Sequence, residues 1–392
     1  MTLSNDLIDR LKKDVIDTMK KIRLDTKVNV YFCKEELSTD QKFGIGPQKI
    51  DVKHRTLYFF VDRAPMYNWG HPCQYILYDV DREKDYKTID TEFPPTDYFI
   101  APEKYEAIHE SIKFVDTLED KRNKMQAMPE LNISLKEARG ERYAILFSGM
   151  SNNRHVNDLE FLYRSLTDLY QFSPSHIYVL NYDGKINYSG SPQPVEKWPG
   201  DNTAYKMKVN LKGTKGLFNK IIAQLAGELK KKDLLLIHVN NHGGGPPSES
   251  ESNICCYPDW DSYNALDFGA KLNDLPKFAS LIVMMEQCHS GGFIRPVIKN
   301  SPAERTHIAA ACADNKSSIG GPFFDPFARD WISGICGHYP DRSNLLQEVD
   351  TNHDRRVSAS EAYVYADTVH DPYDTPCSGE KHKGDGVLLF LG

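Results

Sequence analysis

The chain has 392 residues, of which 40% are hydrophobic and 11% aromatic, and its formal net charge is −7. This length and composition exclude a disordered chain and predict one large or two medium globular domains. The acidic balance, with a pI near 6.0, provides no general basic field, so we expect no nucleic-acid partner. Eight cysteines are too few for a disulfide scaffold and favour reduced thiols.

The N-terminal segment is charged and amphipathic, without the apolar centre of a signal peptide. No apolar run approaches the roughly 18 residues that a membrane-spanning helix requires. We therefore expect a cytoplasmic protein without a membrane partner, and export by a route without a standard signal stays open. Leu3, Leu7, Leu11 and Val15 recur at helical spacing, which predicts an amphipathic helix over the first two dozen residues.

Short β-prone runs follow between residues 27 and 125, namely "KVNVYF", "RTLYFFVD" and "QYILYDVD". Polar turns separate them, so this part of the chain is predicted to form a small α+β module. Residues 122–141 contain no strong strand and indicate a linker or a covering helix. The predicted N-terminal module, of unknown role, therefore spans residues 1–135.

From residue 141 onward, apolar strands alternate with amphipathic helical stretches. The strands are "RYAILFS", "SHIYVLN", "DLLLIHVNN", "SLIVMMEQ" and "THIAAACA". This alternation predicts an α/β fold, a mostly parallel sheet flanked by helices on both faces, over residues 141–345. Residues 346–392 form a separate C-terminal segment in this prediction. Ligand sites in such sheets lie beyond the carboxyl ends of the strands.

Two of these strands end in a similar way. "LLLIHVNNHGGG" contains His242 followed by three glycines, and "LIVMMEQCHSGG" contains Cys288 shortly before two glycines. A thiol becomes a useful nucleophile when an imidazole can accept its proton and backbone N–H groups can hold the oxyanion. A buried cysteine and an unrelated loop histidine are the alternative. The two similar strand ends favour a catalytic pair.

These motifs resemble elements of the caspase-like (clan CD) cysteine peptidases, most closely those of the legumain, or asparaginyl endopeptidase (C13), family. The elements are the His-Gly pair and the Glu-x-Cys-x-Ser-Gly run. Further similar segments are "LFSGMSNNRHVNDLEFLYRSL", "IAAACADNKSS" and "ARDWIS", so the resemblance covers about residues 141 to 340. It implies a caspase-like fold and a cysteine endopeptidase that acts on a protein or peptide substrate.

The resemblance also assigns roles by position. It makes Cys288 the nucleophile, His242 the catalytic imidazole and Asn152 the residue that orients the imidazole. The backbone N–H groups of Gly243 and Cys288 would form the oxyanion hole. Two departures from the family are His289, where an acidic residue commonly follows the nucleophile, and the polar insertion "GGGPPSESESN".

The resemblance places Arg154, Glu286 and Asp330 around the primary specificity pocket. An arginine can donate to the oxygen of a substrate amide, and carboxylates can accept from its NH₂ group. Cleavage after asparagine is therefore expected first. A substrate aspartate would meet two carboxylates unless one were protonated, so we expect aspartate to gain as the pH falls.

Other functions stay open on the same residues. A transamidase or peptide ligase would use the same thioester with an amine in place of water. A non-catalytic peptide-binding protein would keep the scaffold without turnover. The N-terminal module could gate the site, recruit substrate or be removed by self-processing.

A second motif, "DTNHDRRVSASE", begins at residue 350 and has the oxygen spacing of an EF-hand-type calcium loop. The expected ligands are the side chains of Asp350, Asn352, Asp354, Ser358 and Glu361 and the backbone carbonyl of Arg356. Arg355 stands at the sixth position, where glycine normally allows the turn, and a capped acidic turn is the alternative.

We expect the flanking segments "SNLLQEV" and "EAYVYADTV" to be helices. The expected role of Ca²⁺ is structural or regulatory, and the peptidase chemistry requires no cofactor. Paired-cysteine spacings typical of zinc sites are absent, as are phosphate-binding glycine motifs.

Overall fold

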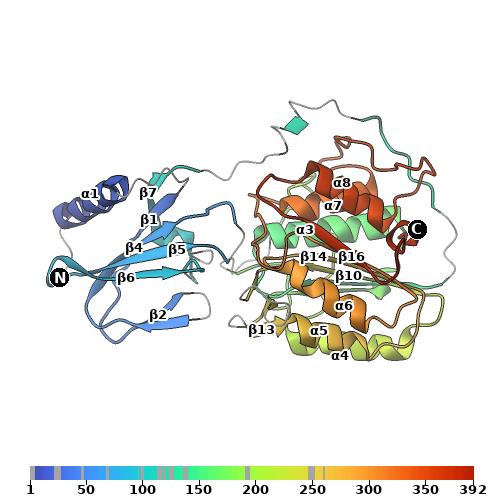
Figure 1. Cartoon of the computed structure of the whole chain (residues 1–392), viewed down its shortest axis with the longest axis horizontal. Helices are drawn as coiled ribbons and strands as arrows, with labels where there is room; N and C mark the ends of the chain where they lie inside the picture. The colour runs from blue at the N-terminus through green and yellow to red at the C-terminus, as the bar shows by residue number, and fades with distance from the viewer. Residues whose placement is uncertain are drawn as a thin grey trace. The chain divides into compact units, whose positions relative to one another are not determined.

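The chain divides into two compact units, Met1–Phe114 and Val115–Gly392 (Figure 1). The computed structural model describes residues 5–21, 28–45, 48–67, 70–95, 97–98, 101–112, 118, 121–122, 128–135, 140–189, 195–245, 252–258 and 261–392. Each unit has its own apolar clusters, so each is considered separately. No helix in these ranges is both long and apolar enough to cross a membrane.

The N-terminal unit contains a five-stranded antiparallel sheet in the order β6-β5-β4-β1-β7. Its elements are α1 (Asn5–Lys21), β1 (Asn29–Cys33), β2 (Lys42–Ile45), β3 (Gln48–Asp51), β4 (Thr56–Asp62), β5 (Cys73–Asp79), β6 (Lys84–Thr91), η1 (Pro102–Lys104) and β7 (Tyr105–Glu110). The predicted helix and the α+β character of this module are both present.

Both faces of this sheet are covered, which explains why the central strand β4 is buried along its whole length. Because side chains alternate along a strand, Phe59 and Val61 point to one face and Tyr58 and Phe60 to the other. The first pair packs in a cluster with Leu11 and other apolar residues of α1. The second pair packs in a cluster with residues of the β2–β3 hairpin.

The second unit contains a six-stranded sheet in the order β16-β15-β14-β10-β8-β9, parallel except for β16. These strands are β8 (Arg142–Ser148), β9 (Ile177–Asn181), β10 (Leu234–Asn240), β14 (Ser280–Glu286), β15 (Arg305–Ala310) and β16 (Cys377–Glu380). A small antiparallel sheet beside it consists of β11 (Gly243–Gly244), β12 (Asn253–Cys256) and β13 (Asp261–Asn264).

Helices cover both faces of the large sheet, so the predicted α/β fold is confirmed (Figure 1). One face packs against α3 (Asn153–Arg164), α7 (Pro326–Cys336) and α8 (Ala359–Val369). The other face packs against α4 (Lys215–Glu228), α5 (Ala265–Leu272) and α6 (Ile294–Asn300). The short turns are the π-helix η2 (Ser165–Leu169) and the 3₁₀ segments η3 (Pro174–His176), η4 (Ser290–Phe293) and η5 (Gly386–Leu388).

The boundary between the units lies at residues 114 and 115, earlier than the predicted position near residue 135. The reason is that the segment 128–135 bonds to the second unit, where Met128 N donates to Leu345 O and Ser134 N to Arg355 O. Residues 346–392 also belong to the second unit, because α8 packs with α7 and β16 pairs with β15. The expected separate C-terminal segment is therefore part of the α/β unit.

The separate cores give a stability prediction. Leu11 on α1 is 5% exposed, so Leu11→Ala should destabilise the N-terminal unit by about 2–5 kcal/mol. Differential scanning calorimetry should show the transition of that unit at a lower temperature, with the transition of the α/β unit unchanged. Lys13→Ala, an exposed position on the same helix, is the control. Equal profiles for both variants would contradict this packing.

Candidate functional site

The three predicted catalytic side chains follow three neighbouring parallel strands. Asn152 comes four residues after β8, His242 two residues after β10, and Cys288 two residues after β14. Strand β10 lies between β8 and β14, and Asn240 is paired with Glu286. The three residues therefore lie beyond the carboxyl ends of adjacent strands, as expected from the parallel pattern.

Close contacts explain two of the glycines beside these residues. A Cβ atom on Gly243 would lie 2.4 Å from the carbonyl oxygen of Cys288, and one on Gly292 would lie 2.1 Å from Ser252 Oγ. Both distances are shorter than atoms in contact allow. His289 has a φ of 61°, which turns the chain sharply after Cys288. Gly243 thus lets the chain after β10 touch the chain after β14.

The small sheet fixes the backbone around His242. Cys255 N donates to His242 O at 3.0 Å, and Asn241 Nδ2 donates to Cys255 O at 2.6 Å. Met150 N, between β8 and Asn152, donates to the same Cys255 carbonyl at 3.0 Å. A single residue of β12 therefore connects the ends of β8 and β10.

Asn152 links His242 to a buried arginine. With its amide oxygen turned toward Arg154, as the surrounding donors require, Asn152 accepts from Nη1 at 3.1 Å and from Nη2 at 3.0 Å. The same terminal atom lies 3.3 Å from His242 Nε2. In this orientation, Nε2–H can donate to Asn152, and Nδ1 then carries the lone pair. That tautomer is the one in which the imidazole can act as a base through Nδ1.

Arg154 is itself held by a carboxylate. Its Nε lies 2.6 Å from Asp325 Oδ1, and His155 Nε2 lies 3.5 Å from Asp325 Oδ2. Burial lowers the pKa of His242 well below its ordinary value, and the nearby Arg154 lowers it further. His242 is therefore a neutral imidazole at neutral pH, which suits a group that must accept a thiol proton.

Cys288 is fully buried at the end of β14. Its Sγ lies 3.9 Å from Ser318 Oγ. Two further thiols are close enough for electrostatic coupling, since Cys288 raises the pKa of Cys255 and of Cys312 beyond the effect of their burial. Those two thiols are thus held in the neutral form, which suits structural residues.

Glu286 ends β14 and is fully buried. Its Oε2 accepts a hydrogen bond from Ala328 N in the first turn of α7 at 3.0 Å, so the carboxyl group meets the positive end of that helix. Burial raises the pKa of Glu286 well above its ordinary value, and neighbouring carboxylates, first Asp325, raise it further.

Glu286 belongs to a group of buried acids, each with a raised pKa caused first by desolvation. The members of this acidic cluster are Asp158, Glu286, Asp325 and Asp374. For Asp325 the value rises to about 7, although Arg154 opposes the shift. The cluster therefore gains protons near neutral pH, which makes its charge sensitive to pH.

Asp330 is fully buried and pairs with two other cations. Asp330 Oδ1 lies 2.9 Å from Arg329 Nε, and Oδ2 lies 3.9 Å from Lys121 Nζ. A carboxylate that contacts Arg154 is Asp325, which was not among the predicted site residues. Asp325 precedes a proline at the start of α7, and an aspartate before a helix-starting proline is a typical N-cap signal that could have identified it.

The predicted calcium loop has a turn geometry that brings its oxygens inward. Asp350 accepts from the backbone N–H groups of residues 354 and 355, and Asn352 and Asp354 accept from residues 354 and 356. Glu361 Oε1 accepts from Thr351 N at 3.1 Å, which closes the loop. Glu361 Oε2 accepts from Ser358 N, forming a capping box on α8.

Two details bear on how well this loop fits a cation. Arg355 adopts a φ of 62° at the sixth position, so the turn that usually needs glycine is made with a side chain. The side chain of Arg356 is directed away, donating to Gly392 O at 2.7 Å. The oxygen set is thus compatible with Ca²⁺. The predicted entering helix is wrong, because residues 343–349 are not helical and Asn344 forms a bridge with His338.

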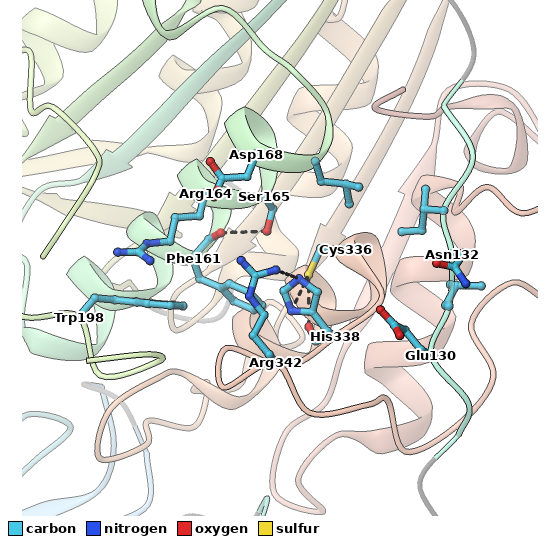
Figure 2. A pocket seen from close by; sticks show the side chains of 13 residues that line it. Glu130, Asn132, Phe161, Arg164, Ser165, Asp168, Trp198, Cys336, His338 and Arg342 are labelled. Atoms are coloured by element: carbon cyan, nitrogen blue, oxygen red, sulfur yellow. Dashed lines mark hydrogen bonds between the residues drawn. The ribbon is translucent and has the colours of Figure 1, made fainter. Parts of the chain in front are cut away.

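A cavity of about 300 Å³ lies at the other end of α3 and α7 (Figure 2). By helical rise, Arg164 in its wall is roughly 18 Å from Asn152. Both arginines in its wall are already engaged: Arg164 Nη1 pairs with Asp201 at 2.8 Å, and Arg342 Nη1 donates to His338 Nε2 at 2.9 Å. The cavity is therefore separate from the predicted catalytic residues.

The model of the peptidase C13 family matches residues 142–348. These are nearly the residues over which the sequence resembles the legumain family. Among solved structures, the crystal structure of protein GSU0716 from Geobacter sulfurreducens aligns with 15% identity and a TM-score of 0.41. The alignment covers 64% of this chain and 97% of that one. The search of curated proteins returned no match.

The raised pKa of Glu286 gives a prediction about stability. The folded chain holds a proton on Glu286 that the unfolded chain releases above its ordinary pKa, so stability should fall as the pH rises above about 4.3. The slope is at most about 1.4 kcal/mol per pH unit for one group. Glu286→Gln removes this group, so its melting temperature should fall less than that of the wild type between pH 5 and 8.

Glu304→Gln, at an exposed position of the same unit, should follow the wild-type pH dependence. Thermal unfolding of the three proteins across this pH range makes the comparison. Parallel curves for Glu286→Gln and the wild type would contradict the raised pKa.

Proposed function

Because the chain belongs to the peptidase C13 family, we propose that it is a cysteine endopeptidase that cleaves after asparagine, with Cys288 as its nucleophile. The observation that carries the proposal is the arrangement at the sheet edge. Asn152, His242 and Cys288 follow three adjacent parallel strands, and the Asn152 amide meets His242 Nε2. Such an arrangement supplies a thiol, a base and a residue that fixes the tautomer of the base.

In the proposed reaction, neutral His242 accepts the thiol proton of Cys288 through Nδ1. The thiolate attacks the substrate carbonyl, and the backbone N–H groups of Gly243 and Cys288 stabilise the oxyanion. The imidazolium of His242 then donates its proton to the leaving amine, which breaks the peptide bond and leaves a thioester. Water attacks the thioester with His242 as base, and the acid product and free thiol are released.

The proposed specificity pocket combines Glu286 with the Arg154–Asp325 pair. Glu286 in its protonated form can donate to a substrate oxygen and accept from an amide NH₂ group. Arg154 contributes positive charge beside these carboxyl groups, while its guanidinium also holds Asn152. Asp330, which also pairs with Arg329, stays a proposed member of this pocket.

Paired peptides that differ only in asparagine or aspartate before the scissile bond test the activity and the pocket together. We expect the asparagine peptide to be preferred at pH 8. Asp325, with a pKa of about 7, loses its negative charge as the pH falls, so the aspartate-to-asparagine ratio of kcat/KM should rise roughly tenfold by pH 6. The tenfold figure corresponds to about 1.4 kcal/mol of removed repulsion.

Cys288→Ala is the control and should cleave neither peptide. Cleavage after basic residues would retain the nucleophile and refute the pocket. Product masses distinguish hydrolysis from transfer to an added amine, which is the reaction of a peptide ligase.

Self-processing is tested separately, by incubating the protein alone and comparing it with Cys288→Ala. If the wild type turns over no peptide, the peptide-binding alternative replaces the proposal.

We further propose that the loop from Asp350 to Glu361 binds Ca²⁺ and stabilises the α/β unit. The support is the inward-turned oxygen set and the closure of the loop by Glu361. A bound cation would offset the negative charge of Asp350, Asp354 and Glu361 and tie the segment before α8 to the start of that helix.

Calcium should raise the melting temperature of the wild-type α/β unit relative to chelator. The expected stabilisation is about 2.7 kcal/mol at a free Ca²⁺ concentration 100 times Kd. Glu361→Gln should abolish the calcium effect, because glutamine keeps the capping box but loses the charged bidentate ligand. Glu348→Gln, an exposed acid just before the loop, should retain the effect. Identical melting curves with calcium and chelator in the wild type would refute the site.

A further inference from the structure

Three side chains of different chemistry meet inside the N-terminal unit, at the base of the loop between β4 and β5. They are Asp62, His71 and Cys73, and one ligand atom from each lies within 4.8 Å of the others. All three residues are at least 96% buried. This set belongs to the N-terminal unit, whereas the proposed catalytic residues belong to the α/β unit.

Strand pairing brings these residues together. Asp62, the last residue of β4, is directly paired with Cys73, the first residue of β5, so their side chains share one face of the sheet. His71 precedes Cys73 by two residues, the spacing at which side chains of extended chain point the same way. Its backbone N–H donates to Glu92 O at 2.8 Å, which fixes its position against the end of β6.

The contact between Asp62 and His71 is close but is not a hydrogen bond. His71 Nε2 lies 3.0 Å from Asp62 Oδ1, yet neither ring nitrogen has a hydrogen-bond partner among the described residues. The ring N–H direction therefore misses the carboxylate oxygen. Two atoms that bind the same metal ion lie close together without a hydrogen bond between them. The lone pair of the ring nitrogen and that of the carboxylate oxygen both point at the ion. Donor atoms around a tetrahedral Zn²⁺ lie about 3.3 to 3.6 Å apart.

We propose that Asp62, His71 and Cys73 bind one Zn²⁺ ion that clamps the base of the β4–β5 loop. A carboxylate, an imidazole and a thiolate are all ligands that Zn²⁺ accepts, and the fourth position is open for water. The two negative ligands neutralise the dication, so the buried site has no net charge. The Ala64 N–H donates to Asp62 Oδ1 at 3.0 Å. This hydrogen bond holds the carboxylate in the orientation that the ion needs.

A plain buried ion pair explains these residues less well. Within the described residues, no lysine or arginine pairs with Asp62, so His71⁺ would be its compensating charge. Such a pair is expected to form a direct hydrogen bond, because a buried charge needs both pairing and hydrogen bonding. The observed geometry lacks that bond, and the Cys73 thiol, which packs at the border of the apolar cluster, lies beside the pair.

Cobalt substitution in the full chain tests the site by absorption spectroscopy. The parent is Cys288→Ala, which removes the proposed catalytic thiol, and excess Ca²⁺ occupies sites made only of oxygen. After treatment with chelating resin, we expect about one Co²⁺ per chain to bind with a thiolate-to-cobalt charge-transfer band. Zn²⁺ should displace the cobalt and remove the band. Cys73→Ser should abolish the band and weaken binding by more than roughly 100-fold, the upper range for outer-shell changes.

Cys33→Ser is the matched control, because Cys33 is equally buried in the same unit but lies outside the cluster. It should keep the band and the metal content. If both serine variants lose the metal, X-ray absorption of the zinc-loaded parent decides. One sulfur neighbour at about 2.3 Å with lighter atoms completing the shell supports the site. No sulfur, several sulfurs, or a parent that binds no metal overturns it.

Discussion

The register of β8, β10 and β14 is the constraint on which the candidate active site depends. The three strands are parallel and adjacent, and Asn240 is paired with Glu286, so the chain leaves neighbouring strands at the same height. A slip of one residue would turn every side chain of a strand to the opposite face. The buried apolar runs on both faces prevent this slip. The apolar core thus determines which polar residues meet at the sheet edge.

Beyond that edge, the site contains more charge than its burial would ordinarily permit. Asp325, Arg154 and Asn152 form a buried path that ends at His242, and Glu286 lies at the first turn of α7. Unpaired buried charges are strongly unfavourable, so the carboxyl groups gain protons and Arg154 offsets the remaining charge. The same residues that orient the base therefore make the stability of the unit depend on pH.

The sequence allowed the α/β fold and the positions of Cys288 and His242 to be predicted, because apolar runs followed by glycines are local signals. Side-chain pairing between distant elements is not a local signal. The ion pair between Arg154 and Asp325 was therefore not predicted, because the two residues are far apart in the sequence. The early domain boundary depends on hydrogen bonds from residues 128–135 to a distant part of the chain. A search for paired cysteines also misses the Asp62–His71–Cys73 set, since hairpin pairing assembles it.

The antiparallel strand β16 protects the large sheet from aggregation with other chains. It is only four residues long, yet it pairs with β15 at one side of an otherwise parallel sheet. Without it, the backbone of the buried β15 would present unpaired N–H and C=O groups to any extended segment nearby. Since β16 follows α8 in the chain, β15 is synthesised well before the strand that pairs with its outer side. Before β16 is made, the outer side of β15 is open to pairing with other chains. Pairing with β16 removes this risk of aggregation.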